Sequence, residues 1–283
     1  MDSLMISVII PSYKPGKYIE ECLKSLSLQD LPAEKFEIII VLNGCNAPWR
    51  TQIQTLIDEY LSHHNVHLIQ TDVPGVSNAR NIGIDKAKGL YISFIDDDDY
   101  ISASYLKELL NTAASDTVSL SNAMAFIDET GDFLTKYPQS LNFKANNPKQ
   151  PLSVFHALKY FNGPCMKLIP REVMGGCRFD TKLANGEDSV YMFQISKNIK
   201  HVIFTPDNAI YYRRYRKQSA TTSKKTTSYW IRNSFKCASS YTRFYLSDPR
   251  RYNFFLYCRY MLACAKTACI EIFNNMKHMG DSK

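Results

Sequence analysis

The chain has 283 residues, of which 45% are hydrophobic and 22% are charged. This length and composition exclude a disordered chain, a collagen and a short disulfide scaffold, and they suit one large globular domain or a core domain with a smaller appendage. The formal charge is +7, but residues 191–283 carry 17 basic and 4 acidic side chains, which leaves 17 and 23 for the first 190. An acidic body therefore precedes a basic C-terminal part.

The C-terminal part also holds 18 of the 35 aromatic residues. A basic and aromatic composition is typical of surfaces that contact phosphates, anionic lipid headgroups or nucleic acid. Amphipathic helices with aromatic cores and solvated Lys and Arg faces would have the same composition. The composition alone leaves both interpretations open.

The cysteines and the N-terminus bear on the compartment. The eight cysteines form no C-x-x-C pair and no zinc-type spacing with histidine, which argues against thiolate metal binding. The N-terminus lacks the pattern of a secretory signal, and no window reaches about 18 uninterrupted apolar residues. We therefore expect a cytoplasmic protein with reduced thiols that lies, at most, on the inner face of the cytoplasmic membrane without crossing it.

The first 110 residues alternate short apolar runs with amphipathic segments. The apolar runs predict buried strands at 6–10, 36–42, 66–70 and 90–95. The spacing of apolar residues predicts helices at 18–28, 53–61 and 78–87. This alternation predicts βαβ units and a parallel sheet with helices on both faces. Ligands bind such sheets outside the carboxyl ends of the strands, so the polar residues after each strand are the candidate functional residues.

After residue 115 the pattern is mixed. We expect a hairpin near 129–132, helices over Leu152–Phe161 and Ser189–Ser196, and short strands at Val202–Phe204 and Ala209–Tyr212. From about Thr227 the pattern is helical, with a break at 247–249. We therefore divide the chain into a domain at 1–220 and a basic, aromatic-rich helical extension at 221–283.

The strand predicted at 90–95 ends in four consecutive aspartates, Asp96 to Asp99. Adjacent carboxylates at one strand end repel each other by about a few kcal/mol per close pair, so a positive group is expected there. Mg²⁺ or Mn²⁺ accepts carboxylate oxygens and is commonly shared with substrate phosphates. The alternative is an acidic loop that caps the helix beginning near Ser102, which accounts for one aspartate more easily than for four.

A second acidic segment, Gly186-Glu187-Asp188, precedes the helix predicted at 189–196. By itself, such a pair is explained as an ordinary helix N-cap. In one cleft with a metal and phosphate site, a carboxylate that does not bind the metal could serve as a general base for a hydroxyl nucleophile. Together the two segments predict metal-assisted displacement of a phosphate leaving group.

Five segments in this order resemble the family 2 glycosyltransferases, which have the GT-A fold, a Rossmann-like and mostly parallel sheet with flanking helices. The resemblance covers about residues 5–215 and includes the late E-D motif at Glu187-Asp188. The other matching segments are Val8–Tyr13 with the helix after it, Glu37–Gly44, the G-x-x-x-A-R-N-x-G segment Gly75–Gly83, and Tyr91–Asp99, which contains the D-x-D-D motif.

The resemblance implies roles for individual residues. Pro11 and Tyr13 would line the nucleotide pocket, and Arg80 would face the donor diphosphate. Asp188 would be the catalytic base. Asp96 and Asp98 would form the D-x-D pair, with Asp98 as the direct ligand of Mg²⁺ or Mn²⁺ and Asp97 or Asp96 near the ribose.

One position departs from the family pattern. Where the family usually has an aspartate that accepts the N–H of uracil, this chain has Asn43. An asparagine side-chain oxygen can still accept that bond, but its amide also donates, so the base is not fixed by the sequence.

Three further segments have two interpretations each. Lys167 is either a ligand of a phosphate or sugar hydroxyl or a surface lysine. The basic segment Tyr211–Ser219 is either a mobile loop that closes over the diphosphate or a plain surface loop. The helical extension either rests on an anionic membrane near a lipid-linked acceptor or packs in a homodimer.

The resemblance therefore implies an inverting, metal-dependent glycosyltransferase, of hexosyl or N-acetylhexosaminyl type, in bacterial surface-polysaccharide synthesis. It would move a sugar from a nucleotide-diphosphate donor, expected to be a UDP-sugar, to a hydroxyl of a glycan or lipid-linked acceptor. The alternatives are another metal-dependent enzyme of nucleotides or phosphates, or a nucleic-acid-binding protein that uses the basic tail. No glycine-rich phosphate loop and no nucleic-acid-binding motif supports either alternative.

Overall fold

The computed structural model describes residues 4–140, 143, 151–154, 156–157, 160–216 and 225–280, with side chains as far as residue 273. The end of the predicted basic segment, from Lys217 to Ser219, and the predicted domain boundary after residue 220 lie outside the described residues.

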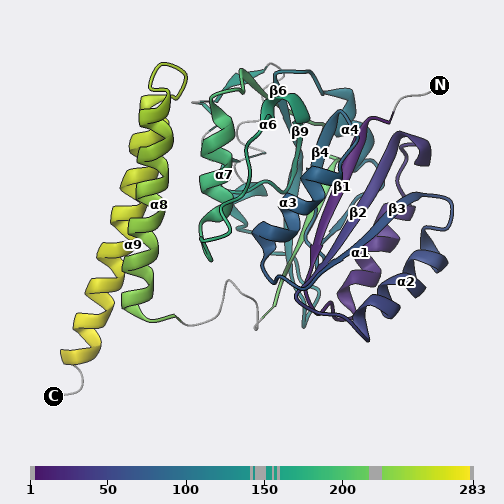
Figure 1. Ribbon diagram of the computed structural model, residues 1–283, viewed down its shortest axis with the longest axis horizontal. Helices are drawn as coiled ribbons and strands as arrows, with labels where there is room; N and C mark the ends of the chain where they lie inside the picture. The colour runs from purple at the N-terminus through teal and green to yellow at the C-terminus, as the bar shows by residue number, and fades with distance from the viewer. Residues whose placement is uncertain are drawn as a thin grey trace.

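A sheet of eight strands forms the centre of the protein (Figure 1). Its first four strands in spatial order are parallel, as the sequence predicts, and β9 then runs antiparallel to both β4 and β6. In spatial order the strands are β3 (Asn65–Thr71), β2 (Phe36–Asn43), β1 (Ile6–Ser12), β4 (Tyr91–Phe94), β9 (Lys167–Pro170), β6 (Thr117–Leu120), β10 (His201–Phe204) and β8 (Leu152–Ser153).

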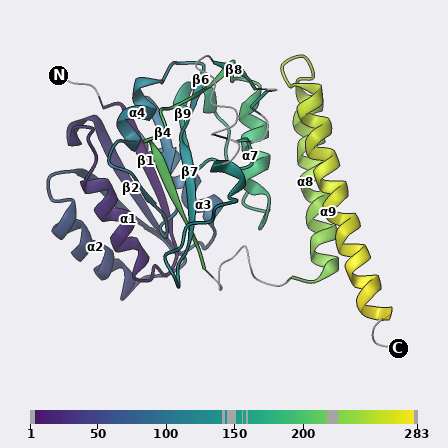
Figure 2. The ribbon, with the colours of Figure 1, turned by 180° about the vertical axis from the view of Figure 1, so that it is seen from behind.

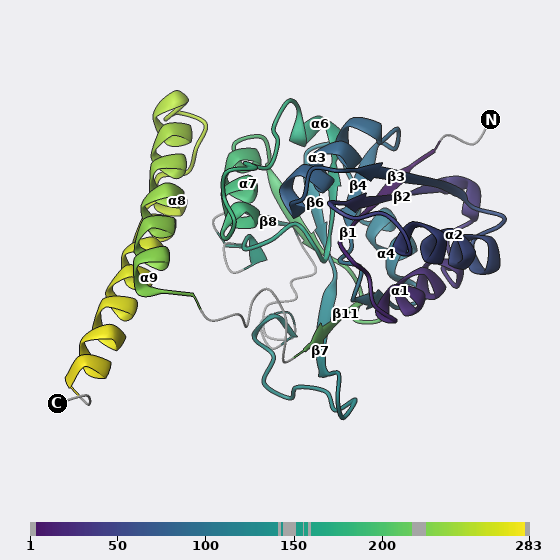
Figure 3. The same ribbon diagram turned by 60° about the horizontal axis from the view of Figure 1, so that its bottom comes forward.

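Helices cover both faces of this sheet, and the alternation of side chains along β1 shows why. Val8 and Ile10 pack in one apolar cluster with α1 (Tyr18–Ser27), α2 (Trp49–Tyr60) and α4 (Tyr105–Asn111). Ile9 points the other way and packs in a second cluster with α3 (Val76–Lys86) and α7 (Glu187–Ser196). Figure 3 shows α1 and α3 on opposite sides of these strands. Burial on both faces is the reason for the continuous apolar runs.

A second, three-stranded sheet lies next to the carboxyl end of β4. It consists of β5 (Tyr100–Ile101), β11 (Ile210–Tyr215) and β7 (Asn122–Ile127), with β11 in the middle. The predicted turn at 129–132 follows β7, and an antiparallel bridge joins Phe126 to Phe133. The strand predicted at 209–212 continues to Tyr215, so the first arginines of the basic segment lie in a strand rather than in a loop.

The helix predicted over Leu152–Phe161 is wrong for the residues that the structure describes. Leu152 and Ser153 form β8, which pairs antiparallel with β10, and turns follow it. Two residues of strand are held by pairing with a distant segment, and this tertiary contact overrides the local helical pattern. Two further short helical segments are η1 (Ala33–Lys35) and α6 (Arg171–Met174).

The C-terminal helices α8 (Thr227–Ser247) and α9 (Phe254–Gly280) form a long antiparallel hairpin beside α7 (Figures 1 and 2). The break predicted at 247–249 separates them. One face of the hairpin joins the main core through Tyr241, Tyr252 and Leu256. Part of the aromatic content of the tail is therefore core packing. Neither of these helices, nor any other in the described part of the chain, is long and apolar enough to cross a membrane.

Candidate active site

The four aspartates after β4 bind different partners from different elements. The carboxylate of Asp96 accepts a hydrogen bond from Arg80 on α3, at 3.0 Å, and that of Asp98 forms an ion pair with Arg216 after β11. Ser104 is the N-cap of α4 and makes no side-chain capping bond. The aspartates are therefore bound to cations and hydroxyls rather than to the end of that helix, against the capping alternative.

Asp97 and Asp99 accept hydrogen bonds from polar groups of the two sheets. Asp97 accepts a bond from the Ser12 hydroxyl at the end of β1, at 2.6 Å. Asp99 is 3% exposed and accepts bonds from the Tyr211 hydroxyl at 2.7 Å and the Arg214 backbone N–H at 2.8 Å. These contacts hold the loop of the four aspartates against β1 and β11. Asp97 and Asp99 therefore have structural roles.

Arg80 joins the two acidic segments. Its guanidinium is buried and donates to Asp96 at 3.0 Å and to Asp188 at 2.5 Å, with Glu187 at 3.9 Å. Burial alone would lower the pKa of Arg80, but Asp188 and Asp96 raise it above its ordinary value. The sequence predicts that Arg80 faces the donor diphosphate, and the structure places it between carboxylates that line one cavity.

Burial raises the pKa values of several carboxyl groups in the two segments. Burial raises the pKa of Asp97 to about 7, against a weaker lowering by Ser12, and the neighbouring aspartates add to the rise. Burial also raises the pKa of Glu187 to about 7, with the charge of Asp188 as the next cause. For Asp188, burial raises the pKa more than Arg80 lowers it. Asp188 also lines the cavity between the two segments, and a raised carboxyl pKa in a cavity is typical of catalytic sites.

The predicted nucleotide-binding residues lie at the ends of β1 and β2. Pro11 is buried in β1, and Tyr13 is 53% exposed, with Lys14 over its ring at 5.3 Å. Asn43 is 3% exposed. Its amide donates to the Ser12 carbonyl at 2.7 Å and its oxygen accepts from the Gly75 backbone N–H at 2.8 Å. Asn43 thus ties three loops together, while Tyr13 presents an open ring beside them.

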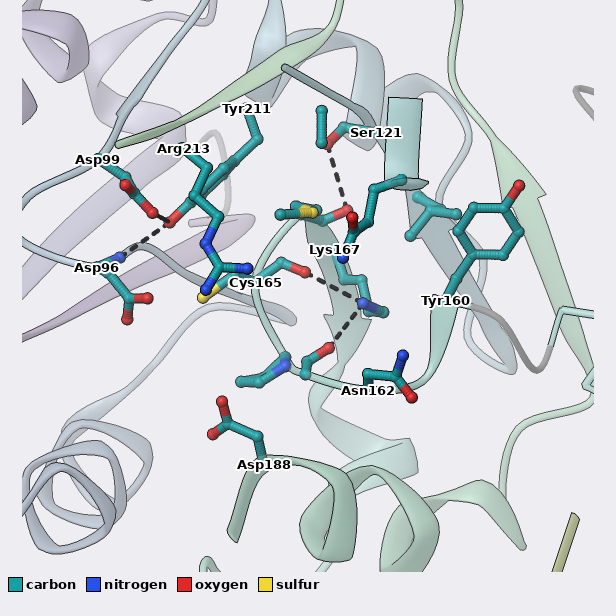
Figure 4. Close-up of a pocket in the computed structure, with 16 residues that line it drawn as sticks. Asp96, Asp99, Ser121, Tyr160, Asn162, Cys165, Lys167, Asp188, Tyr211 and Arg213 are labelled. Carbon is teal, nitrogen blue, oxygen red and sulfur yellow. Dashed lines mark hydrogen bonds between the residues drawn. The ribbon is translucent and has the colours of Figure 1, made fainter. Parts of the chain in front are cut away.

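A cavity of about 210 Å³ lies between the two acidic segments. Asp188 projects into it from the start of α7, and Asp96 and Arg213 face it from the sheet side (Figure 4). Cys165 also lines it, and burial raises the pKa of its thiol, which favours the neutral form. The cavity therefore combines carboxylates, a guanidinium and backbone groups around a space that two acidic motifs share.

Lys167 lies in the wall of this cavity and is 3% exposed, so the interpretation as a surface lysine is wrong. Its ammonium donates to the carbonyls of Gly163 at 2.7 Å and Cys165 at 3.1 Å (Figure 4). Burial lowers the pKa of Lys167 to about 8. Lys167 therefore holds the Gly163–Cys165 loop against the cavity.

The arginines of the basic segment have separate positions. Arg213 lines the cavity. The guanidinium of Arg214 is 7% exposed and binds Asp128 at 2.6 Å and Glu21, so this residue is not part of a mobile loop. Successive side chains of a strand point to opposite faces, so Arg213 and Arg214 lie on opposite faces of β11.

Sequence reasoning missed two hydroxyls that hold the aspartates. Ser12 lies between two residues that the sequence singles out, and Tyr211 begins the basic segment. The Tyr211 hydroxyl also accepts a bond from the backbone N–H of Asp96, at 3.1 Å. The available signal was that both residues lie in segments already identified, but nothing local shows which carboxylate each one binds.

Comparisons with known proteins identify the family of this chain. Residues 7–175 match the sequence model of the family described as Glycosyl transferase family 2. The chain is 29% identical over 213 residues to the poly(ribitol-phosphate) beta-N-acetylglucosaminyltransferase TarS of Staphylococcus aureus, across 74% of this chain and 35% of TarS. It is 28% identical to the uncharacterized glycosyltransferase EpsJ of Bacillus subtilis, across 74% of this chain and 61% of EpsJ. The chain thus spans less than two thirds of the length of both relatives.

The fold also matches solved structures. The crystal structure of S. aureus TarS 1-349 in complex with UDP-GlcNAc superposes with a TM-score of 0.68 at 24% identity, over 84% of this chain and 66% of that chain. The complex with UDP gives a TM-score of 0.64. These matches confirm the GT-A fold. The family match favours glycosyl transfer over the two alternatives, another phosphate enzyme and a nucleic-acid-binding protein.

Proposed function

Because the chain belongs to the family 2 glycosyltransferases, we propose that it is an inverting, metal-dependent glycosyltransferase. It moves a hexosyl or N-acetylhexosaminyl group from a UDP-sugar to a hydroxyl of a glycan or lipid-linked acceptor in the synthesis of bacterial surface polysaccharide. The observation that carries this proposal is the contact of Arg80 with both Asp96 and Asp188, which brings the strand-end and helix-start carboxylates to one cavity.

The aspartate segment fits a hard divalent cation. Arg80 contacts Oδ1 of Asp96 and Arg216 contacts Oδ2 of Asp98, which leaves one oxygen of each carboxylate for a metal. Burial and the neighbouring aspartates raise the pKa values of Asp97 and Asp98, and a bound cation would favour the ionised form of both. Among the described residues no group of three or more His, Cys, Asp or Glu is arranged to hold a metal. Mg²⁺ is usually held by one or two carboxylates, with substrate phosphates and water as the other ligands, so Asp96 and Asp98 would be its protein ligands.

When bound, Mg²⁺ or Mn²⁺ would stabilise the negative charge that develops on the leaving diphosphate. The chain's own residues supply the rest. Asp188 accepts the proton of the acceptor hydroxyl as its oxygen attacks the anomeric carbon. Arg80 orients Asp188 through its short hydrogen bond. Attack opposite the leaving group inverts the configuration, and no covalent intermediate with the enzyme is needed.

The donor nucleotide would lie against the ends of β1 and β2. Tyr13 has the exposed ring needed to stack on a base, and Lys14 lies next to it. Asn43 uses its amide and its oxygen within the protein, but an amide oxygen has a second lone pair that could accept a base N–H. Arg213 faces the cavity, where a guanidinium would suit the diphosphate.

Named relatives suggest the substrates. TarS and the poly(ribitol-phosphate) beta-glucosyltransferase of Bacillus spizizenii, at 29% identity, act on poly(ribitol phosphate) according to their names. UDP-GlcNAc is bound in the TarS crystal structure. We therefore take UDP-GlcNAc and UDP-glucose as the first donors to test, and a polyol-phosphate or glycan chain as the acceptor class.

The experiment is a donor screen. The protein is incubated with Mn²⁺ and a panel of UDP-, GDP- and dTDP-sugars, and both the melting temperature and the release of nucleotide are recorded. We expect one UDP-sugar to raise the melting temperature in the presence of metal, with loss of the effect in EDTA and in Asp98→Asn. Binding of no nucleotide sugar would refute the proposal, and undiminished transfer in EDTA would refute the metal requirement.

The outer face of the C-terminal hairpin supports peripheral contact with an anionic membrane. Several large apolar side chains on it are exposed, including Phe254, Phe255 and Leu262, and so are the cations Arg259 and Lys266. Apolar and cationic groups on one helix suit the interface of an anionic bilayer. We expect the protein to sediment with phosphatidylglycerol vesicles and not with neutral ones. A dimer in solution that buries Phe254 and Phe255, with no vesicle binding, would favour the homodimer instead.

A further inference from the structure

A groove of about 290 Å³ separates the start of α7 from the C-terminal hairpin. Its walls come from α7, α8 and α9, which lie side by side in Figure 1. It lies largely outside residues 7–175, the segment that matches the family. The residues that the argument uses are Asn162, Asn185, Ser189, Trp230, Asn233 and Cys237.

The groove adjoins the active-site cavity. Asn162 lines both spaces. Gly186 and Ser189 line the groove, and Asp188, between them in sequence, lines the cavity. A chain that lies in the groove would therefore lie next to the segment that carries the proposed catalytic base.

The lining of the groove suits a sugar or polyol. Trp230 is partly buried and lines the groove, and the C–H groups of a sugar ring can pack against an indole ring. The amides of Asn162 and Asn233 are near it, and an amide both donates to and accepts from hydroxyls. An aromatic surface with a few placed polar groups is the usual composition of a small-molecule site.

Helix α8 also fixes the segment that carries the base. Tyr229 donates to the Asn185 side chain at 2.5 Å, and Asn233 donates to the Asn185 carbonyl at 3.0 Å. Gly186 has a φ of +81°, and a Cβ there would lie 2.9 Å from the sulfur of Cys237. This close contact and the left-handed backbone both require glycine. The groove wall and the base loop are therefore one rigid unit.

We propose that this groove is an acceptor subsite that binds a sugar or polyol chain, with Trp230 as the surface on which a unit next to the reacting one packs. The proposal rests on the proposed function, because only a transferase has an acceptor to place there. It assigns acceptor selection to the C-terminal hairpin, and donor binding to the sheet.

The chain has two tryptophans, Trp49 and Trp230. Trp49→Phe therefore leaves Trp230 as the single tryptophan reporter. We would titrate this variant with chitotriose and, separately, with a trimer of ribitol phosphate, and record tryptophan emission. A saturable change with either probe supports the subsite, and the arm that responds identifies a neutral or a phosphate-bearing chain. No change with either at about 10 mM, beyond the weak end of useful affinity, overturns it.

Kinetics give a second, independent test. Trp230→Ala is compared with Phe235→Ala, an exposed aromatic on the same helix that does not line the groove. Using the acceptor that responds in the titration, we expect the first variant to raise the acceptor KM about tenfold or more, with donor affinity and melting temperature unchanged. The second variant should leave all three unchanged, and Trp230→Phe should restore much of the loss.

The outcomes separate the two proposals. Normal donor binding with an unchanged acceptor KM in Trp230→Ala overturns the subsite and leaves the transferase standing. Failure of the wild-type protein to bind any nucleotide sugar overturns the proposed function itself.

Discussion

The two acidic segments reach the same cavity by different routes. Asp96 to Asp99 follow a buried strand, and each carboxylate has its own partner from α3, β1, β11 or the residue after β11. Glu187 and Asp188 begin a helix after a left-handed glycine, and Arg80 is their common cation. The strand end crowds like charges and needs several elements to hold them, whereas the helix start needs one guanidinium. At the helix start one guanidinium thus serves both carboxylates.

Arg80 can serve both segments because α3 lies close to β1. A Cβ at Gly83 would be 2.4 Å from a methyl carbon of Ile9, so only glycine permits this distance between helix and strand. Gly83 lies one turn further along α3 from Arg80. Gly83 therefore allows α3 to lie close to β1, which brings the guanidinium of Arg80 near both acidic segments.

The largest effect should come from the helix-start segment. Asp188→Asn keeps an oxygen that can accept the bond from Arg80, so the fold should survive, but an amide cannot take the acceptor's proton. We expect the transfer rate to fall by about 10²- to 10⁴-fold, the usual contribution of a general base. Steady-state rates and melting temperature measure both consequences. The matched control is Asp85→Asn, which removes a surface carboxylate paired with Arg178. Retained turnover in Asp188→Asn would remove that residue from the role of base.

The next two predictions concern Arg214 and Arg213. We expect substitution of Arg214 to lower stability and substitution of Arg213 to lower donor affinity. Arg214→Ala leaves Asp128 without its ion pair and removes a donor to the Asp98 carbonyl. We expect the free energy of unfolding to fall by about 3 kcal/mol, the low end for a buried pair because Glu21 is half exposed. Urea denaturation measures it.

Arg213→Ala should instead lower donor affinity by about tenfold, which calorimetry with the UDP-sugar detects, because a guanidinium bound to diphosphate contributes a charge-assisted bond. Equal losses of stability in both variants, with donor affinity unchanged, would show that Arg213 is also structural.

Much of the N-terminal half could be predicted from the sequence. Strands buried on both faces leave long apolar runs, and the helices between them keep a clear apolar stripe, so β1 to β4 and α1 to α3 were all located. The two-residue strand β8 could not be found, because its pairing with β10 is a contact between distant segments. The antiparallel direction of β9 is likewise set by its neighbours and not by its own residues.

The sequence identified which residues belong to the site, but it did not show how they are arranged. The sequence pointed to Asp96, Arg80 and Asp188, but it could not show that one guanidinium binds both carboxylates, since the two segments are 92 residues apart. The helices of the C-terminal hairpin were predicted by their periodicity. The face of α8 that holds Asn185 and its loop depends on how the hairpin packs on α7, which no local pattern records.

The smallest effect concerns the pH dependence of the helix-start segment. Burial raises the pKa of both carboxyl groups, and that of Glu187 to about 7. Asp188 acts as a base only when ionised, so activity should fall as the pH drops through its raised pKa. Electrostatic repulsion is mutual, so Glu187→Gln removes a charge that opposes ionisation of Asp188.

We therefore expect the acid limb of kcat/KM to move to lower pH in Glu187→Gln, by up to about one unit. The basic limb should stay where it is, and a pH–rate profile with saturating metal measures both limbs. An acid limb that does not move would mean that Arg80 screens the two carboxylates from each other, and the helix-start segment would then act through Asp188 alone.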